Sequence, residues 1–200
     1  MSLLTTIRLL RASLAASLLL SCLIASPTVT AADLDLAADA APWQVVNDGV
    51  MGGVSSSRIE ADAGGVRFSG VVRTEYNGGF ASARRAVAAD ALPADAAAFA
   101  LRARGDGHRY RLVVYTRDAR GRPQAFSYFA EFQTEAGRET AQRLRLVDFR
   151  AGFRGRAVPE APPLAMVDVI GVGLMLLKDG HRDGRGPFGL HLLSLQGAIG

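Results

Sequence analysis

Apolar and polar residues alternate with a period of two along much of the chain after residue 65. In the segment 66–74, valine and phenylalanine alternate with arginine and serine, which is typical of a strand with one buried face. Two later runs are more continuously apolar, which predicts central strands at 167–177 and 188–195. The period-two pattern itself recurs in four further segments, 99–104, 110–114, 126–132 and 143–146.

Turn signals separate these runs, among them Gly105-Asp106-Gly107 and Glu135-Ala136-Gly137. Many short strands at this spacing predict an all-β sandwich or barrel. The one helix candidate, 86–98, is rich in alanine but contains Pro93, so it predicts a single turn or a loop. The segment 151–164 contains three prolines and is expected to be a long surface connection.

The first 32 residues have the anatomy of a signal peptide. Arg8 and Arg11 precede an apolar stretch, 14–24, and small residues follow as far as Ala32. We therefore expect residues 1–32 to be removed, 33–41 to be a short linker and 42–197 to be a single domain, periplasmic or secreted. A transmembrane span needs roughly 20 apolar residues, so no transmembrane segment is expected in the mature chain.

Cys22 adds an alternative to simple secretion. The sequence Leu19-Leu20-Ser21-Cys22 resembles a degenerate bacterial lipoprotein box, in which the cysteine becomes the lipidated first residue. A lipid anchor through Cys22 is therefore the alternative to simple secretion. Because Cys22 is the only cysteine, the mature domain is expected to have neither a disulfide nor a thiolate site.

Length and composition are those of one globular domain, with 200 residues, of which 49% are hydrophobic and 21% charged. The formal net charge of +4 includes Arg8 and Arg11. Without them, 21 basic residues stand against 19 acidic ones. This small excess is weak evidence for a polyanion, and no nucleic-acid partner is expected.

Two glycine-rich segments, Asn47–Gly53 and Asn77–Arg84, stand out between the predicted strands. Asparagine and glycine both tolerate positive φ, so each segment can form a tight turn. One interpretation is purely architectural: Asp48 and Asp106 cap turns, and Arg84 pairs with an acidic residue. The other is a recognition patch at one end of the sandwich, with Met51 and Phe80 among polar groups. On that interpretation the predicted binding residues are Asn47, Asp48, Met51, Gly52, Gly53, Ser55, Asn77, Gly78, Gly79, Phe80, Ser82 and Arg84.

Catalytic and metal-binding motifs are not evident in the sequence. It has no G-x-S-x-G elbow, its three histidines are scattered, and no zinc-ligand spacing occurs. The glycines at 49–53 lack the ending of a P-loop. We therefore expect no catalytic residues, no cofactor and no metal, and the alternative is an uncharacterised enzyme. Calcium at the acidic loop near Asp179 and Asp183 remains open, and a solvated hairpin tip is favoured there.

The stretches 43–55 and 77–84 closely resemble the signature of the complex I intermediate-associated protein 30 family. The similarity covers roughly residues 42–197 and continues through 101–110, 149–156, 170–173 and 186–188. It implies a galactose-binding-like jelly-roll β-sandwich, in agreement with the strand pattern. It also implies a family whose mitochondrial members act as assembly factors for respiratory complex I. The export signal departs from that role, which lies on the inner side of a bioenergetic membrane.

These observations lead to two functional hypotheses. The first is a non-catalytic exported binding module with a protein partner, acting as a protein-assembly or chaperone-like factor of the bacterial envelope. The alternative is a carbohydrate- or polysaccharide-binding module of the envelope, which rests on fold analogy and export. Sugar sites usually present stacking aromatics, and Trp43 is the only tryptophan.

Overall fold

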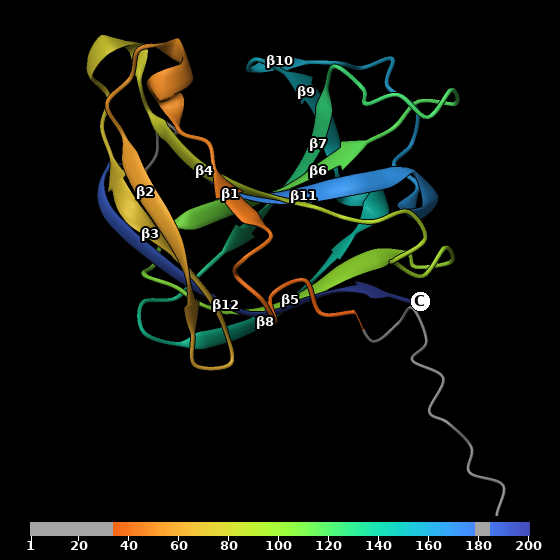
Figure 1. Cartoon of the computed structure of the whole chain (residues 1–200), viewed down its shortest axis with the longest axis horizontal. Helices are drawn as coiled ribbons and strands as arrows, with labels where there is room; N and C mark the ends of the chain where they lie inside the picture. The colour runs from red at the N-terminus through yellow and green to blue at the C-terminus, as the bar shows by residue number, and fades with distance from the viewer. Residues whose placement is uncertain (1–33, 179–184) are drawn as a thin grey trace, which may run out of the picture.

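Two antiparallel sheets pack face to face in the computed structural model, which describes residues 34–178 and 185–200 (Figure 1). The prediction of an all-β sandwich is therefore confirmed. The predicted signal peptide, Cys22 and the acidic loop with Asp179 and Asp183 lie outside the described residues. Within the described part, no helix is long and apolar enough to span a membrane.

The larger sheet has seven strands in the order β1-β4-β11-β6-β7-β9-β10. Its central strand β11 pairs with β4 on one side and with β6 on the other. The two edges are short strands, β1 and β10. The seven strands are β1 (Trp43–Val45), β4 (Phe80–Ala86), β6 (Arg109–Thr116), β7 (Ser127–Gln133), β9 (Arg150–Phe153), β10 (Arg156–Ala157) and β11 (Val169–Leu177).

The smaller sheet has five strands in the order β2-β3-β12-β5-β8. Its long central strand β12 pairs with β3 through its first half and with β5 through its second half. His191 and Leu192 pair with both neighbours, and the register with β5 shifts between Leu192 and Ser194. The five strands are β2 (Ser56–Asp62), β3 (Gly65–Val72), β5 (Ala98–Arg104), β8 (Glu139–Arg145) and β12 (Gly186–Ala198).

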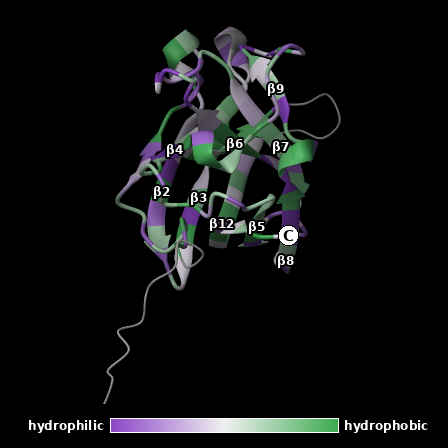
Figure 2. Ribbon diagram, turned by 90° about the vertical axis from the view of Figure 1, so that its right-hand side faces the viewer, coloured by the Kyte–Doolittle hydropathy of each residue, from purple (hydrophilic) through white to green (hydrophobic). Residues whose placement is uncertain are grey.

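The period-two segments lie on strands except at some of their ends, and hydrophobic and hydrophilic residues alternate along them (Figure 2). The alanine-rich segment 86–98 is a loop between β4 and β5, as its proline predicts. The segment 151–164 is less uniform than expected, because it contains most of β9 and all of β10 before a proline-rich connection. That connection leads to the short turn η5 (Met166–Asp168), from which β11 starts.

The core fills the space between the two sheets with aromatic and aliphatic side chains. Phe68 and Phe188 meet with their ring centroids 4.9 Å apart, and Tyr110 stacks on Phe132 at 5.9 Å. Trp43, the only tryptophan, is buried there and donates from its Nε1 to the carbonyl of Leu36. Burying this apolar area is the main source of stability in a domain of this size.

Residues 34–41, expected to form a linker, instead pack against the domain. Leu36 and Ala37 are buried in the core. The backbone N–H of Leu36 donates to the carbonyl of Leu195, and the Asp35 carboxylate accepts from the N–H of Leu195. The sequence suggests a linker because small and acidic residues predominate in it, but among residues 34–41 Leu36 and Ala37 are buried. The domain therefore starts before residue 42.

The larger sheet is curved. In Figure 1 the two turns η2 (Asp48–Met51, orange) and η3 (Glu75–Asn77, yellow) rise at one end of the sheet, and β9 and β10 rise at the other. The two turns at one end and the two strands at the other all lie on the side of β11 that faces away from the smaller sheet. The two glycine-rich segments therefore lie beside the outer face of the seven-stranded sheet.

Candidate functional site

The carboxylate of Asp48 joins the two glycine-rich segments. This residue starts the turn η2, yet its side chain is fully buried. Its Oδ1 accepts from the N–H of Ser55 at 3.0 Å. Its Oδ2 accepts from the Ser55 hydroxyl at 2.5 Å and from the N–H groups of Gly79 and Phe80 at 2.6 and 3.3 Å. One carboxylate therefore fixes the first segment against the second, which lies about thirty residues later.

The electrostatics of this junction favour an ionised carboxylate. Burial alone would raise the pKa of Asp48, but the hydrogen bonds from Ser55, Gly79 and Phe80 outweigh it and hold the pKa below its usual value. A buried charge is tolerated only when hydrogen bonds replace its lost hydration. The donors around Asp48 meet that requirement.

Asn47, the residue before Asp48, also links strand ends at this end of the molecule. Its Oδ1 accepts from the Ser57 hydroxyl at 2.7 Å and from the N–H of Ser82 at 3.3 Å. The Ser82 hydroxyl in turn donates to the carbonyl of Val46. Asn47 thus connects the ends of β1, β2 and β4.

Two glycines make the close approach around Asp48 possible. A Cβ added at Gly53 would lie 2.6 Å from Asp48 Oδ1, and one added at Gly78 would lie 2.7 Å from Asp48 Oδ2. Neither distance is compatible with a side chain. Gly52 has a φ of +88°, which ends η2 in the left-handed region.

Four apolar side chains are exposed on these two turns and the chain that follows η2. We call them the tip patch: Val50, Met51, Val54 and Tyr76, which are 73, 58, 44 and 76% exposed. Tyr76 has a left-handed backbone (φ 53°, ψ 41°), which costs about 1 kcal/mol for a non-glycine residue. Such outliers persist only where the surrounding structure enforces them, and they gather at functional sites. The Asp48 junction holds both turns in place.

The structure places the predicted binding residues in different parts of the molecule. It brings both glycine-rich segments together, with the turn containing Asn77 next to Gly78. Asn47, Asp48, Ser55 and Ser82 form the polar junction itself, so they position the turns. Phe80 is half-buried at the start of β4. Arg84 does not join this junction and lies on the outer face of the seven-stranded sheet, over Tyr115. Three residues of the tip patch, Val50, Val54 and Tyr76, are not among the binding residues predicted from the sequence, although Tyr76 directly precedes the second glycine-rich segment.

Arg84 lies on the outer face of the seven-stranded sheet. Its Cζ is 4.8 Å from the centroid of the Tyr115 ring, a cation–π contact, rather than beside an acidic residue as expected. A Cβ added at Gly173 would lie 3.4 Å from the ring and hydroxyl of Tyr115, and one at Gly171 would lie 3.5 Å from its Cδ2. The tyrosine therefore lies across β11, in the space that the missing side chains leave.

The register of the sheet places an arginine near each end of one row on this face. Paired residues in adjacent strands point to the same side, and the row crosses six strands. Its middle is apolar, and Val113 is buried there although it is not part of the core between the sheets. In strand order the row contains Gln44, Arg84, Gly173, Val113, Phe129 and Arg150.

A second cation–π contact lies in the middle of the same face. The Cζ of Arg111 is 4.6 Å from the centroid of Phe129. Arg111 also donates to Glu131 at 2.7 Å, and Arg109 lies 3.4 Å from the same carboxylate. These bonds hold the pKa of Glu131 below its usual value, against the effect of its burial. Glu131 is thus shared by two arginines.

The outer face of the five-stranded sheet has a different character. It is covered by exposed ion pairs, which contribute little to stability and keep a surface solvated. Phenylalanine, tyrosine and tryptophan are absent from the register rows of this face in the described strands. The pairs are Arg58–Glu60, Arg67–Asp62, Arg102–Glu139 and Arg145–Asp148.

Asp106 forms a second, separate junction. Its Oδ1 accepts from the N–H of His108 at 3.0 Å, which is the turn cap that the sequence predicts. Its Oδ2 accepts from the Tyr110 hydroxyl at 3.0 Å and from the N–H of Gly189 at 2.7 Å. The pKa of Asp106 is lowered because the hydrogen bonds from Gly189 and His108 outweigh its burial. This carboxylate ties the turn between β5 and β6 to β12.

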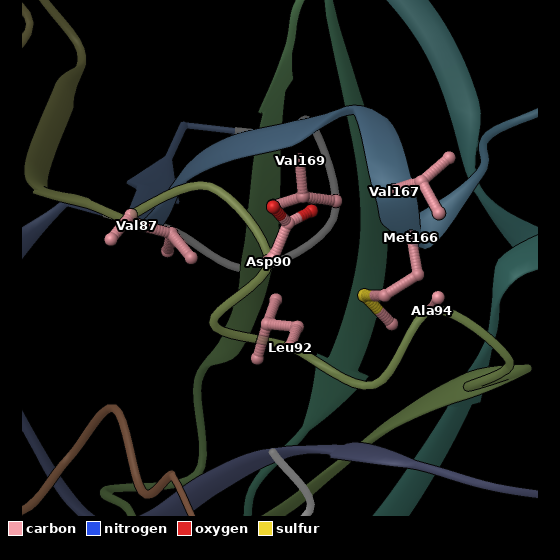
Figure 3. Close-up of a pocket in the computed structure, with 8 residues that line it drawn as sticks. Val87, Asp90, Leu92, Ala94, Met166, Val167 and Val169 are labelled. Carbon is pink, nitrogen blue, oxygen red and sulfur yellow. The ribbon is translucent and has the colours of Figure 1, made fainter.

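Two cavities of the described part of the molecule are lined by named side chains. The first, of about 150 Å³, lies between the loop after β4 and η5, where Leu92 and Met166 line it with Asp90 at its edge (Figure 3). The second, of about 560 Å³, lies under the proline-rich connection and is lined mainly by apolar residues. Among residues 34–178 and 185–200, no group of three or more metal-ligating side chains gathers.

The family of this chain follows from a match to one family model. The model of the complex I intermediate-associated protein 30 family matches residues 32–192. The chain belongs to this family. Both glycine-rich segments, the Asp48 junction and the Asp106 junction lie inside the matched range. The match begins before the expected domain start, in line with the packing of Leu36. No curated protein matches the chain.

Solved structures of similar fold include carbohydrate-binding modules of Clostridium thermocellum. The family 11 module of the cellulosomal cellulase Lic26A-Cel5E is 11% identical, with a TM-score of 0.58 over 84% of this chain and 96% of that one. The family 11 module in complex with a β-1,3-1,4-mixed-linked tetrasaccharide is 13% identical, with a TM-score of 0.56 over 79% and 90%. At these identities the similarity shows the fold, and it confirms the jelly-roll β-sandwich expected for members of the complex I intermediate-associated protein 30 family.

Proposed function

We propose that this chain is a non-catalytic, exported binding module that holds a protein partner through the tip patch, as an assembly or chaperone-like factor of the bacterial envelope. The supporting observation is that a buried, fully hydrogen-bonded carboxylate fixes two turns whose outward side chains are apolar. Rigid loops that expose apolar and aromatic anchors are suited to protein recognition. Membership of a family with assembly factors and the predicted signal peptide agree with this role.

The tip variant Met51→Asp/Tyr76→Asn tests this proposal. Asparagine tolerates the left-handed backbone of residue 76, so the fold should remain intact while the exposed apolar area is lost. We expect the wild-type domain to capture a discrete set of proteins from envelope extract. The tip variant should capture at least about tenfold less of these proteins. Quantitative mass spectrometry of the captured proteins is the measurement.

Val147→Asp is the matched control for the tip variant. Val147 is apolar and 83% exposed, but it lies in η4 (Leu146–Asp148), outside both glycine-rich segments. This control should capture the same proteins as the wild type. Identical capture by the wild type and the tip variant would contradict the proposal.

Carbohydrate binding is the second candidate function. The observation that favours it is the contrast between the two outer faces: ion pairs cover one, whereas Tyr115 and Phe129 lie on a glycine-containing floor on the other. The fold neighbours named as carbohydrate-binding modules raise this possibility by analogy. Native gels containing neutral and acidic polysaccharides test it, since retardation in any of them supports binding and retardation in none removes this candidate.

A further inference from the structure

We propose that the outer face of the seven-stranded sheet binds an acidic polysaccharide, with Arg84 and Arg150 holding its carboxylate or sulfate groups on either side of the apolar floor. This inference rests on the second candidate function, and it names the ligand class. It assigns the face to a ligand different from that of the tip patch.

The charges on this face point to an anionic ligand. Within the described strands, four arginines project from it by register, Arg84, Arg109, Arg111 and Arg150, against the one acidic residue Glu131. Glu131 is already shared by Arg109 and Arg111. Within the described part of the chain, no carboxylate forms an ion pair with Arg84 or Arg150.

The spacing of these two arginines suits an extended chain. Arg84 is on β4 and Arg150 on β9, and three strands lie between them. At about 4.8 Å per strand, their backbones are about 19 Å apart across the sheet. A ligand that reaches both must therefore be a polymer with several acidic groups rather than a small anion.

The surroundings of the aromatic rings favour a ligand with acidic groups over one that stacks on uncovered rings. Arg84 covers Tyr115 and Arg111 covers Phe129, so the ring faces are already occupied by guanidinium groups. A guanidinium that lies on a ring keeps N–H groups at its edge, where it can bind a carboxylate or sulfate with two donors. The same coverage argues against single-stranded nucleic acid, which binds by stacking its bases on open rings.

Neutral polar groups between the arginines suit the hydroxyl groups of a sugar chain. The side chains of Gln44, Tyr115 and Ser127 reach this face and make no hydrogen bond to other described residues. Burial raises the pKa of Tyr115, although Arg84 acts in the opposite direction, so its hydroxyl stays protonated and able to donate. An acidic peptide would gain little here, because the backbones of these central strands are already paired on both sides.

Native affinity gels with matched polysaccharides test the inference on the full domain. The acidic set is polygalacturonate, alginate, hyaluronan and chondroitin sulfate. The neutral set is fully methyl-esterified polygalacturonate and mixed-linkage β-glucan. We expect at least one acidic polymer to retard the wild-type domain. The face variant Arg84→Gln/Arg150→Gln should bind this polymer at least about tenfold more weakly, because each hydrogen bond to a charged group that is lost reduces the binding free energy.

The control variant is Arg58→Gln/Arg102→Gln, which removes the same charge from the opposite outer face. It should bind as the wild type does, and the near-ultraviolet circular dichroism of all three proteins should agree. Equal weakening in the control would show unspecific charge attraction and overturn the inference. Retardation by neutral polymers alone would also overturn it while leaving carbohydrate binding intact, and retardation by none would remove both.

Discussion

Replacing Asp48 with alanine is expected to lower the free energy of unfolding by about 3–5 kcal/mol at pH 7, because buried donors lose their only acceptor. The N–H groups of Ser55, Gly79 and Phe80 all point at this carboxylate. Urea unfolding followed by the fluorescence of Trp43, which is buried in the core, measures the change. The control is Asp95→Ala at an exposed loop position, where a change within about 0.5 kcal/mol is expected.

The difference in unfolding free energy between wild type and Asp48→Ala should depend on pH, and this dependence identifies its electrostatic contribution. The pKa of Asp48 is lower in the folded protein than in the unfolded chain. Its ionised form therefore stabilises the fold fully above the unfolded pKa, near 4, and this contribution is lost as the pH falls through the folded pKa. The gap between wild type and Asp48→Ala should shrink below about pH 4. A gap that stays constant down to pH 2 would assign the effect of Asp48 to packing instead.

Gly53→Ala is expected to destabilise the protein by about 2–4 kcal/mol, because the new methyl group would overlap a side chain that cannot move. It would lie 2.6 Å from Asp48 Oδ1, and any shift of that carboxylate breaks its bonds to Ser55 and Gly79. Thermal unfolding together with urea titration measures the loss.

Gly49→Ala is the matched control for this substitution. It lies in the same segment, but a Cβ there would meet no atom within 4 Å. The unfolding free energy should stay within about 0.5 kcal/mol of wild type. Equal destabilisation by both substitutions would show that the segment is sensitive to any side chain, and that the packing around Asp48 is not the cause.

The sequence predicted the strands with a clear alternation, because one face of each is buried in the core. β3, β5, β6 and β7 all lie where the period-two pattern indicates. The edge strand β2 was not predicted, because only Ile59 packs against the core and the neighbouring residues are polar. Residues 34–41 were misread for a similar reason, since only Leu36 and Ala37 are buried among small and acidic residues.

The site was predictable in its segments but not in its contacts. Glycine and asparagine indicated two turns at strand ends, and both exist. The bond from Gly79 to Asp48 spans 31 residues, and no local pattern shows it. Likewise, the contact between Arg84 and Tyr115 depends on the order β4-β11-β6, which places two strands that are distant in sequence on either side of one glycine-bearing strand.

Site-specific photocrosslinking in living cells tests the central claim, that the two turns form one partner-binding tip, most directly. A photoreactive phenylalanine analogue is placed at position 51, 76 or 147 of the full-length chain. The account predicts the same discrete protein adducts from positions 51 and 76, and none of these from position 147. Absence of adducts from both tip positions, or identical adducts from all three, would contradict it.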